Sequence, residues 1–177
     1  MTLSIVVPIF NEKNTILAIL KKVEEIDLGD IKKEIILVDD GSSDGTGDIL
    51  KTLEDKYKVI YHEKNQGKGA AVRTGFKHVT GDMVLIQDAD LEYDPQNYFN
   101  LLKPILDNKA DVVFASRFMN PEFHHVSKLS HLANVVLTGF SNLLTGLHLT
   151  DMWTCHKIFK KEVIDAIGPL LTGNRFE

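Results

Sequence analysis

The sequence has little cysteine and no excess of basic charge. Cys155 is the only cysteine among 177 residues, which excludes an internal disulfide and a zinc site built from a cysteine cluster. Lysine and arginine (20) are outnumbered by aspartate and glutamate (25), and the net charge of -5 argues against a general nucleic-acid binder. A basic leader with a cleavage site is also missing from the first residues. We therefore expect a protein of a reducing compartment, cytoplasmic or at the cytoplasmic face of a membrane, that binds anions through a metal ion or a few placed cations.

One stretch lacks charge altogether. From Leu129 to Thr150 there is no Lys, Arg, Asp or Glu, and the length approaches that of a membrane span. Polar residues nevertheless recur at spacings of three and four, which places them in a stripe: His131, Asn134, Thr138, Ser141 and Thr145. The pattern predicts an amphipathic helix rather than a spanning one. We expect this helix to pack on a sheet, with contact to a membrane surface as the alternative.

Short apolar runs rich in valine and isoleucine predict five mostly buried strands, at Leu3–Val7, Glu34–Val38, Val59–Tyr61, Met83–Ile86 and Val112–Ala115. Helical patterns lie between them: apolar residues spaced from Ile16 to Ile26, then Thr46–Lys56 with Asp44 as N-cap, a third ending near Val79, and a fourth starting at Asp94-Pro95. Alternating strands and helices with short links predict an α/β fold with a mostly parallel sheet. The chain has the length of one ordinary domain.

Unusual residues follow four of the predicted strands. Ligands of open α/β sheets bind beyond the carboxyl ends of the strands, so these segments are expected to meet at one edge. They are Pro8–Glu12, Asp39–Thr46, Asn65–Ala71 and Gln87–Glu92.

The last of these segments carries three carboxylates at alternate positions, Asp88, Asp90 and Glu92. Alternate residues of an extended chain face one side, where like charges repel. A divalent cation relieves the repulsion, because hard cations take oxygen ligands. The pattern indicates either a Mg²⁺ or Mn²⁺ site or a solvated acidic turn.

Several single residues allow two interpretations each. Gly67-Lys68-Gly69 matches neither a P-loop nor a dinucleotide fingerprint, so no motif assigns a role to the nearby cations. Lys68 and Arg73 either contact a base or diphosphate or are solvated charges at a helix start. Asp39 and Asp40 either accept hydrogen bonds from a nucleotide or build a turn.

On the other side of the expected site, Arg117 follows the fifth strand and either holds a phosphate or lies on the surface. Asp151 suits an acceptor site or a turn, and His156 is expected to be a surface or packing residue.

Taken together, these motifs resemble family 2 glycosyltransferases with the GT-A fold, most closely the polyprenol-phosphate branch similar to dolichol-phosphate mannose synthase. The resemblance covers nearly the whole chain and rests on the order and spacing of Pro8–Glu12, Val38–Thr46, Asn65–Ala71, Gln87–Asp90, Ser116–Arg117 and Thr150–Asp151. It implies a single Rossmann-like GT-A domain over residues 1–177, with a mostly parallel central sheet flanked by helices, which we expect to be truncated at the C-terminus relative to this branch.

The resemblance also implies roles for individual residues. Those that would hold the nucleotide are Pro8, Phe10, Glu12, Asp40, Lys68, Arg73, Asp88 and Ala89. Asp88-Ala89-Asp90 matches the DxD motif, which implies that Asp88 and Asp90 bind the metal, with Glu92 beside them. Catalytic roles fall on Asp90, on Arg117 at the acceptor phosphate and on Asp151 beside the acceptor. Many relatives carry Ser/Thr-Gly-Phe-Arg where this chain has Thr154–Lys157, so Lys157 stands in place of an arginine.

The expected function is a metal-dependent, inverting transfer of a hexosyl group from a nucleotide-diphosphate sugar to a polyprenyl phosphate. Transfer to a saccharide or other hydroxyl in cell-envelope glycan synthesis is one alternative. A nucleotide-sugar-binding domain without turnover is another. A haloacid-type phosphohydrolase and a receiver domain fit poorly, because their acidic residues follow other strands.

Overall fold

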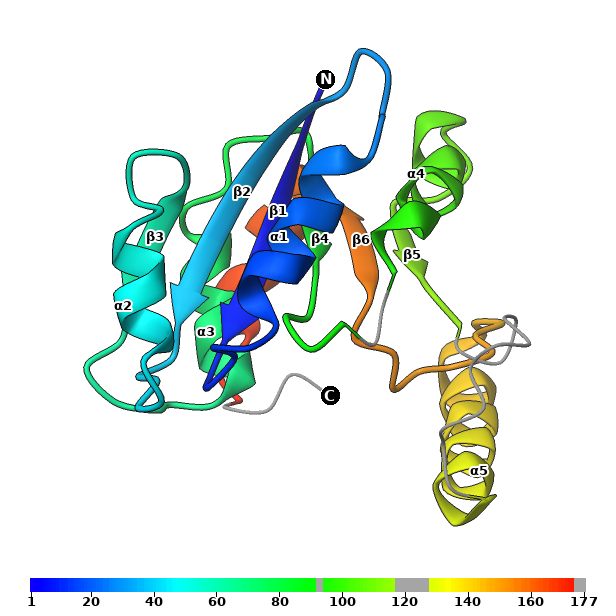
Figure 1. The fold of residues 1–177 in the computed structure, drawn as a ribbon. Coiled ribbons are helices and arrows are strands. Elements are labelled where there is room, and N and C mark those ends of the chain that lie inside the picture. The colour runs from blue at the N-terminus through cyan, green and yellow to red at the C-terminus, as the bar shows by residue number, and fades with distance from the viewer. Residues whose placement is uncertain (92–93, 117–127, 174–177) are drawn as a thin grey trace.

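The computed structural model describes residues 1–91, 94–116 and 128–173. Strands and helices alternate through most of the chain, as Figure 1 shows. The strands are β1 (Thr2–Ile9), β2 (Lys32–Asp39), β3 (Lys58–Tyr61), β4 (Met83–Ile86), β5 (Val112–Phe114) and β6 (Lys157–Lys160). The helices are α1 (Ile16–Glu25), α2 (Thr46–Lys51), α3 (Lys68–Phe76), α4 (Tyr98–Leu106), α5 (Lys128–Thr145) and α6 (Lys161–Ile167), with short 3-10 turns η1 (Pro95–Asn97) and η3 (Gly168–Leu170).

The strands of the described residues form one sheet, in the order β3-β2-β1-β4-β6-β5. β1 pairs in parallel with β2 and β4, and β2 pairs in parallel with β3. The sequence predicted five strands and a mostly parallel sheet, and both are confirmed. The sixth strand, β6, was missed: it lies antiparallel between β4 and β5. Its four residues begin and end with lysine, so the segment shows neither a long apolar run nor an alternating pattern.

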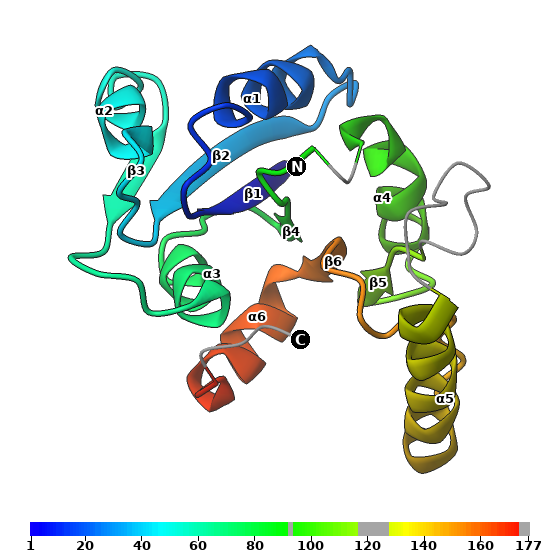
Figure 2. The ribbon, with the colours of Figure 1, turned by 60° about the horizontal axis from the view of Figure 1, so that its bottom comes forward.

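Helices cover both faces of the sheet, as Figure 2 shows. On one face α1, α2 and α4 pack against the side chains of β1 that include Leu3, Ile5 and Val7. On the other face α3 and α6 pack against Val6 and the neighbouring strand residues. Burial on both faces explains why the central strands read as continuous apolar runs.

Capping residues set the helix starts that the sequence predicted. Asp94 Oδ1 accepts a hydrogen bond from Gln96 N at 3.1 Å, with Pro95 at the first position of η1, which leads into α4. Asp44 Oδ1 accepts from Thr46 N at 2.9 Å at the start of α2, although Gly45 is the formal N-cap residue. α2 ends at Lys51 and α3 at Phe76, both earlier than predicted.

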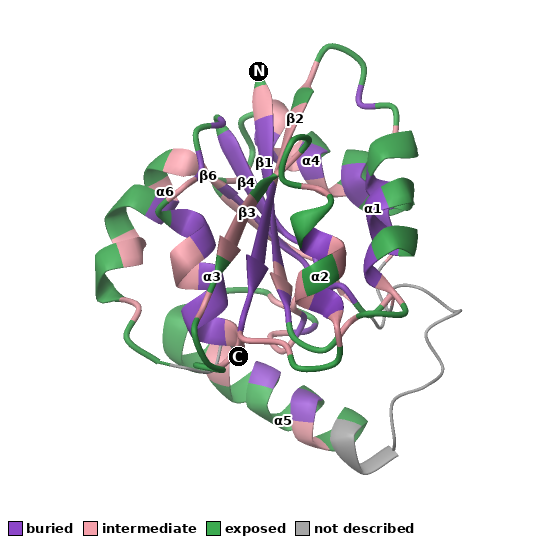
Figure 3. Ribbon diagram, turned by 60° about the vertical axis from the view of Figure 1, so that its left-hand side comes forward, coloured by how far each residue is buried: buried purple, intermediate pink, exposed green. Residues whose placement is uncertain are grey.

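The expectation that the charge-free helix packs on the sheet is wrong. α5 stands away from the sheet in Figures 1 and 2, and Figure 3 shows that most of its residues are exposed. Its buried side chains are polar, Asn134 and Thr138. The exposed ones include Leu132, Val135, Val136, Leu137, Phe140, Leu143 and Leu144. Of the predicted polar stripe, Asn134 and Thr138 are buried and Ser141 is partly buried, whereas His131 and Thr145 are exposed. Across the described residues, no helix combines the length and the hydropathy that crossing a membrane requires.

Candidate active site

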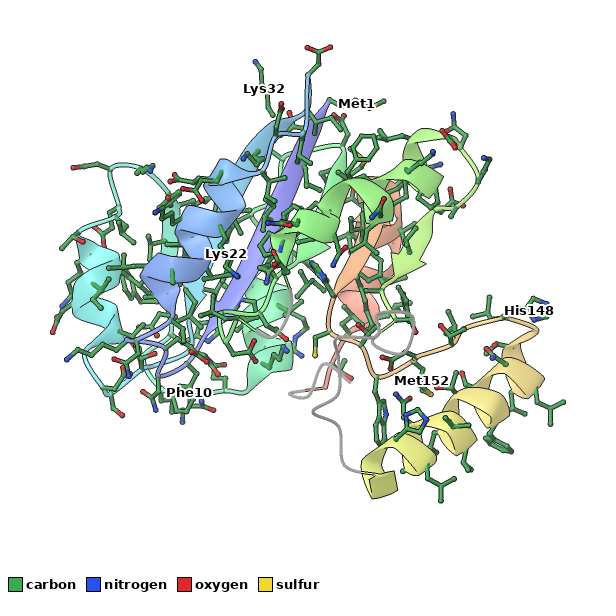
Figure 4. The ribbon with its side chains drawn as sticks, turned by 45° about the vertical axis from the view of Figure 1, so that its right-hand side comes forward. Met1, Phe10, Lys22, Lys32, His148 and Met152 are labelled. Atoms are coloured by element: carbon green, nitrogen blue, oxygen red, sulfur yellow. The ribbon has the colours of Figure 1, made fainter. Side chains whose placement is uncertain are left out.

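A pocket of about 250 Å³ opens at the carboxyl edge of the sheet. Segments that follow β1, β2, β3 and β4 all contribute to its wall, as the strand-end rule predicted. Its lining residues are Pro8, Ile9, Phe10, Glu12, Asp40, Asn65, Lys68, Ala71, Asp88, Ala89 and Asp90. Eight of the residues expected to bind nucleotide or metal thus lie together. Figure 4 shows Phe10 at this end of β1.

The loops after β1 and β2 are joined by side chain–backbone hydrogen bonds. Asn11 Oδ1 accepts from Ser43 N at 2.8 Å, and Ser42 Oγ accepts from Asn11 N at 2.9 Å. Lys13 N donates to Asp44 Oδ2 at 3.2 Å. Asn11 adopts a φ of 57°, which asparagine tolerates better than most residues. These contacts fix the side of the pocket that carries Phe10 and Glu12.

The loops after β2 and β3 are joined through Asp40, which is 2 % exposed. Its carboxylate accepts hydrogen bonds from Gln66 N at 3.0 Å and Gly67 N at 2.8 Å. Gly41 has a φ of 72° and lies so close to the other loop that a Cβ there would come within 2.6 Å of the Lys64 carbonyl carbon. Asp39 instead builds the turn, because its Oδ1 accepts from Ser42 N at 3.1 Å.

An ion pair joins the start of α3 to the end of β4. Lys68 Nζ lies 2.6 Å from Asp88 Oδ1, and the Asp88 side chain is 8 % exposed. Burial by itself lowers the pKa of Lys68, but the Asp88 carboxylate more than offsets this, so the net pKa is raised and the ammonium stays charged. Cys155 contacts both partners. Burial raises the pKa of its thiol and the Asp88 carboxylate raises it further, so the thiol stays protonated.

A chain of buried hydrogen bonds connects Tyr98, through Gln87, to the backbone of Asp88. Gln87 Nε2 donates to Asp88 O at 2.9 Å, and Tyr98 Oη donates to Gln87 Oε1 at 2.9 Å. The ring of His156 packs 5.6 Å from that of Tyr98, between centroids. His156 is 3 % exposed, and burial lowers its pKa to about 4, so it is a neutral packing residue at physiological pH.

The charge of the pocket bears on metal binding. Four lining side chains are carboxylates (Glu12, Asp40, Asp88 and Asp90) and one, Lys68, is cationic. Among residues 1–91, 94–116 and 128–173 no three His, Cys, Asp or Glu side chains gather closely enough to hold a metal by themselves. Mg²⁺ commonly takes one or two carboxylates together with substrate phosphates. Asp88 and Asp90 fit that pattern. Glu92 lies outside the described residues.

The three residues expected on the acceptor side, Asp151, Lys157 and Arg117, lie outside the donor pocket or outside the described residues. Asp151 is 1 % exposed and does not line the pocket: its Oδ1 accepts from Asn134 Nδ2 at 2.6 Å. Lys157 is buried in β6, with its ammonium 4.9 Å from the centroid of the Phe114 ring. Arg117 lies outside the described residues.

Arg73 is on a different side of α3 from Lys68. Residues five positions apart on a helix point about 140° apart. Arg73 lines a second pocket, of about 410 Å³ beside α6, and its guanidinium donates to Gly173 O. This position corrects the expectation that Lys68 and Arg73 face the same ligand.

Sequence reasoning missed two residues that touch the site. His62 contacts Asp40, and nothing in the sequence around β3 distinguished this histidine from a surface one. The sequence predicts no contact between Cys155 and Asp88, because the strand that follows Cys155 is not apparent from the sequence. Because Lys157 of β6 pairs with Ile86 of β4, a prediction of β6 would have placed Cys155 beside the end of β4.

Comparison with known proteins places the chain in a family. The chain is 28% identical over 192 residues to a UDP-N-acetylglucosamine–dolichyl-phosphate N-acetylglucosaminyltransferase of Methanococcus voltae, covering 98% of this chain and 75% of that protein. It is 30% identical over 169 residues to an undecaprenyl-phosphate 4-deoxy-4-formamido-L-arabinose transferase of Edwardsiella ictaluri, covering 93% of this chain but only half (50%) of the relative.

A solved structure shares the fold. The mannosyltransferase PcManGT from Pyrobaculum calidifontis, in complex with GDP-Man and Mn²⁺, matches with a TM-score of 0.69 at 23% identity, over 94% of this chain and 46% of that one. The family model for glycosyl transferase family 2 matches residues 4–168. With the fold, the pocket and this match in agreement, the chain belongs to glycosyl transferase family 2 and is a glycosyltransferase.

Proposed function

We propose that this enzyme transfers a hexosyl group from a nucleoside-diphosphate sugar to a polyprenyl phosphate, with inversion and with Mg²⁺ or Mn²⁺. The observation that carries the donor half is the convergence of Asp40, Lys68, Asp88 and Asp90 from three strand ends on one pocket. Phe10, 45% exposed at its rim, offers an aromatic face for a base.

The charge of the pocket supports the proposal of a metal ion. A diphosphate is an anion, and the lining holds more carboxylates than cations. Asp88 and Asp90 would hold Mg²⁺ or Mn²⁺, which supplies Lewis-acid stabilisation of the departing diphosphate. Lys68 would add its charge on the side of Asp88. The solved mannosyltransferase of the same fold holds Mn²⁺ with its nucleotide sugar, which supports this assignment.

The acceptor half rests on α5 and on the relatives. The two curated relatives are named for transfer to dolichyl and undecaprenyl phosphates. In this chain α5 exposes a charge-free apolar face, while its polar side is used by hydrogen bonds to its own return segment: Asn142 bonds both backbone groups of Leu149, and Thr138 Oγ1 accepts from Met152 N. An apolar helix face of this kind suits contact with a lipid surface.

Transfer to a phosphate acceptor does not require a strong general base. A phosphate oxygen is already anionic when it attacks the anomeric carbon, the bond from that carbon to the diphosphate oxygen breaks, and the nucleoside diphosphate leaves. The buried position of Asp151 is compatible with such a reaction, because no proton must be removed.

The test is a transfer assay of the full-length protein with UDP-, GDP- and dTDP-sugars, polyprenyl phosphate or soluble saccharides, and Mn²⁺ or Mg²⁺. The proposal expects a glycosylated lipid phosphate that disappears with chelator. Transfer to saccharides alone would move the assignment to a hydroxyl acceptor.

A further inference from the structure

A buried histidine fixes the carboxylate that we assign to nucleotide recognition. His62 Nδ1 lies 2.7 Å from Asp40 Oδ1, and its Nε2 lies 2.9 Å from Thr74 Oγ1 on α3. The side chains of His62 and Asp40 are 8 % and 3 % exposed. Because the carboxylate can only accept, Nδ1 carries the proton, and the Thr74 hydroxyl can act as donor or acceptor toward Nε2. The imidazole therefore holds Asp40 in one orientation.

The hydrogen bonds of Asp40 leave little room for a ligand. A carboxylate has about four acceptor positions. Asp40 Oδ1 accepts from His62 Nδ1 and from Gln66 N, and Oδ2 accepts from Gly67 N. One position remains, on Oδ2, and Asp40 lines the pocket. The side chain can thus receive one further donor.

We propose that His62 determines the base preference of the donor site, so that the site favours uracil over guanine. This inference rests on the proposed function and names its nucleotide. Uracil presents a single ring donor, N3–H. Guanine presents two adjacent donors, N1–H and N2–H, which pair best with both oxygens of a carboxylate, and here His62 and Gln66 N already occupy Oδ1. A buried donor left without a partner weakens binding.

Asn65 and Phe10 complete an edge that fits uracil. Asn65 Oδ1 accepts from Gly67 N at 3.1 Å, so its Nδ2 is the end that can donate into the pocket. A uracil carbonyl beside N3–H is the matching acceptor. The exposed ring of Phe10 provides a stacking face that does not depend on the base.

The first experiment uses the unmodified protein. Titration calorimetry with Mn²⁺ should show that UDP binds at least about tenfold more tightly than GDP, as expected for one unpaired donor. N3-methyl-UDP, which lacks the donor, should lose a similar factor relative to UDP. Equal affinities for UDP and GDP, or unchanged affinity for N3-methyl-UDP, would overturn the inference while the proposed function stands. Absence of binding by any nucleoside diphosphate would overturn both.

The second experiment tests His62 itself. His62→Leu removes the donor to Oδ1 and frees an acceptor position, so the ratio of UDP to GDP affinity should fall toward one. His62→Asn is the matched control, because its amide nitrogen can take the place of Nδ1 and should preserve the ratio. A merely structural role would weaken both nucleotides equally. A folded His62→Leu protein with the original ratio would contradict the inference, and the N3-methyl-UDP comparison decides the matter if this variant does not fold.

Discussion

Lys68 and Asp88 form an ion pair, 2.6 Å between Nζ and Oδ1, that closes the donor pocket between α3 and the end of β4. Before any ligand binds, this lysine already neutralises one of the two carboxylates proposed for the metal. Ligand binding must therefore rearrange an existing pair as well as add contacts.

Replacing Lys68 with methionine should destabilise the protein and weaken binding of a nucleoside diphosphate. The buried Asp88 carboxylate would lose its partner, which costs about 1–3 kcal/mol for a partly buried pair. Denaturant unfolding measures the loss. Lys51→Met is the control, because Lys51 and Asp48 form an exposed pair and no change in stability is expected. Equal effects of the two substitutions would contradict a special role for Lys68.

Asp90→Asn should weaken nucleoside-diphosphate binding in Mn²⁺ without changing the fold. Asp90 is exposed at the pocket, so removing its charge should leave the core unaffected while removing one proposed metal ligand. Calorimetric titration with and without chelator is the measurement. Asp55→Asn, at an exposed turn away from the pocket, controls for loss of one negative charge. Binding of the same strength in excess chelator would rule out the metal.

His156 should make stability depend on pH between about 6.5 and 4. Burial lowers the pKa of this imidazole from 6.5 to about 4, so between these values the unfolded chain binds more protons than the folded one. The contribution is complete above the unfolded pKa and is lost as the pH falls toward the folded one, by up to about 3 kcal/mol.

Unfolding free energies at pH 7, 5.5 and 4.5 test this prediction. Carboxylates titrate near the acid end of the same range, so the informative quantity is the difference between the native protein and His156→Phe. That difference should shrink or reverse in favour of the phenylalanine variant as the pH falls. A difference that stays constant with pH would mean that His156 is not buried as a neutral ring.

The apolar face of α5 should drive binding to lipid vesicles. Phe140, Leu143 and Leu144 are 59%, 80% and 70% exposed, so replacing all three with serine should reduce vesicle flotation with no loss of thermal stability. Because Leu129 to Thr150 carries no Lys, Arg, Asp or Glu, binding through this helix should depend little on salt. Leu17→Ser, on the exposed side of α1, is the control. Unchanged flotation of the triple variant would contradict binding of this face to lipid. A concentration-dependent dimer that the triple variant abolishes would assign the face to a second copy of the chain.

Asp151 offers a way to tell the two acceptor classes apart. Asp151→Asn keeps an oxygen for Asn134 Nδ2 and removes only the charge, so transfer to a phosphate acceptor should persist within about tenfold. Asp151→Ala should instead leave the Asn134 amide unsatisfied, destabilise α5 by about 1–3 kcal/mol and speed its hydrogen exchange. A loss of about a hundredfold or more in a well-folded Asp151→Asn protein would indicate a general base and a hydroxyl acceptor.

The parts of the site that sequence could predict share one physical cause. Parallel strands place their carboxyl ends at one edge, so recognising the runs before Pro8, Asp40 and Asp88 was enough to bring these residues together. The order of the strands does not determine the distances between side chains or the hydrogen-bond partner of each carboxylate. His62 shows why: its role depends on a side-chain contact across 22 residues that no local pattern encodes.

The two errors in the fold also have physical reasons. Periodicity shows which residues of α5 share a face, but it does not say which face turns inward, and hydrogen bonds to Asp151 and to the backbone of Met152 reversed the expected orientation. β6 escaped notice because Lys157 is buried with its ammonium against the Phe114 ring, so a residue that reads as exposed belongs to the sheet interior.

The position of β6 has a consequence for how the chain is made. Among the described strands, β5 pairs with β6 alone, and the first residue of β6 comes 43 residues after Phe114. While a ribosome synthesises the intervening segment, β4 presents an open edge and β5 has nothing to pair with, so the half-made sheet is exposed to other chains. Released chains that end before Lys157 should therefore aggregate more readily than chains that include all of β6.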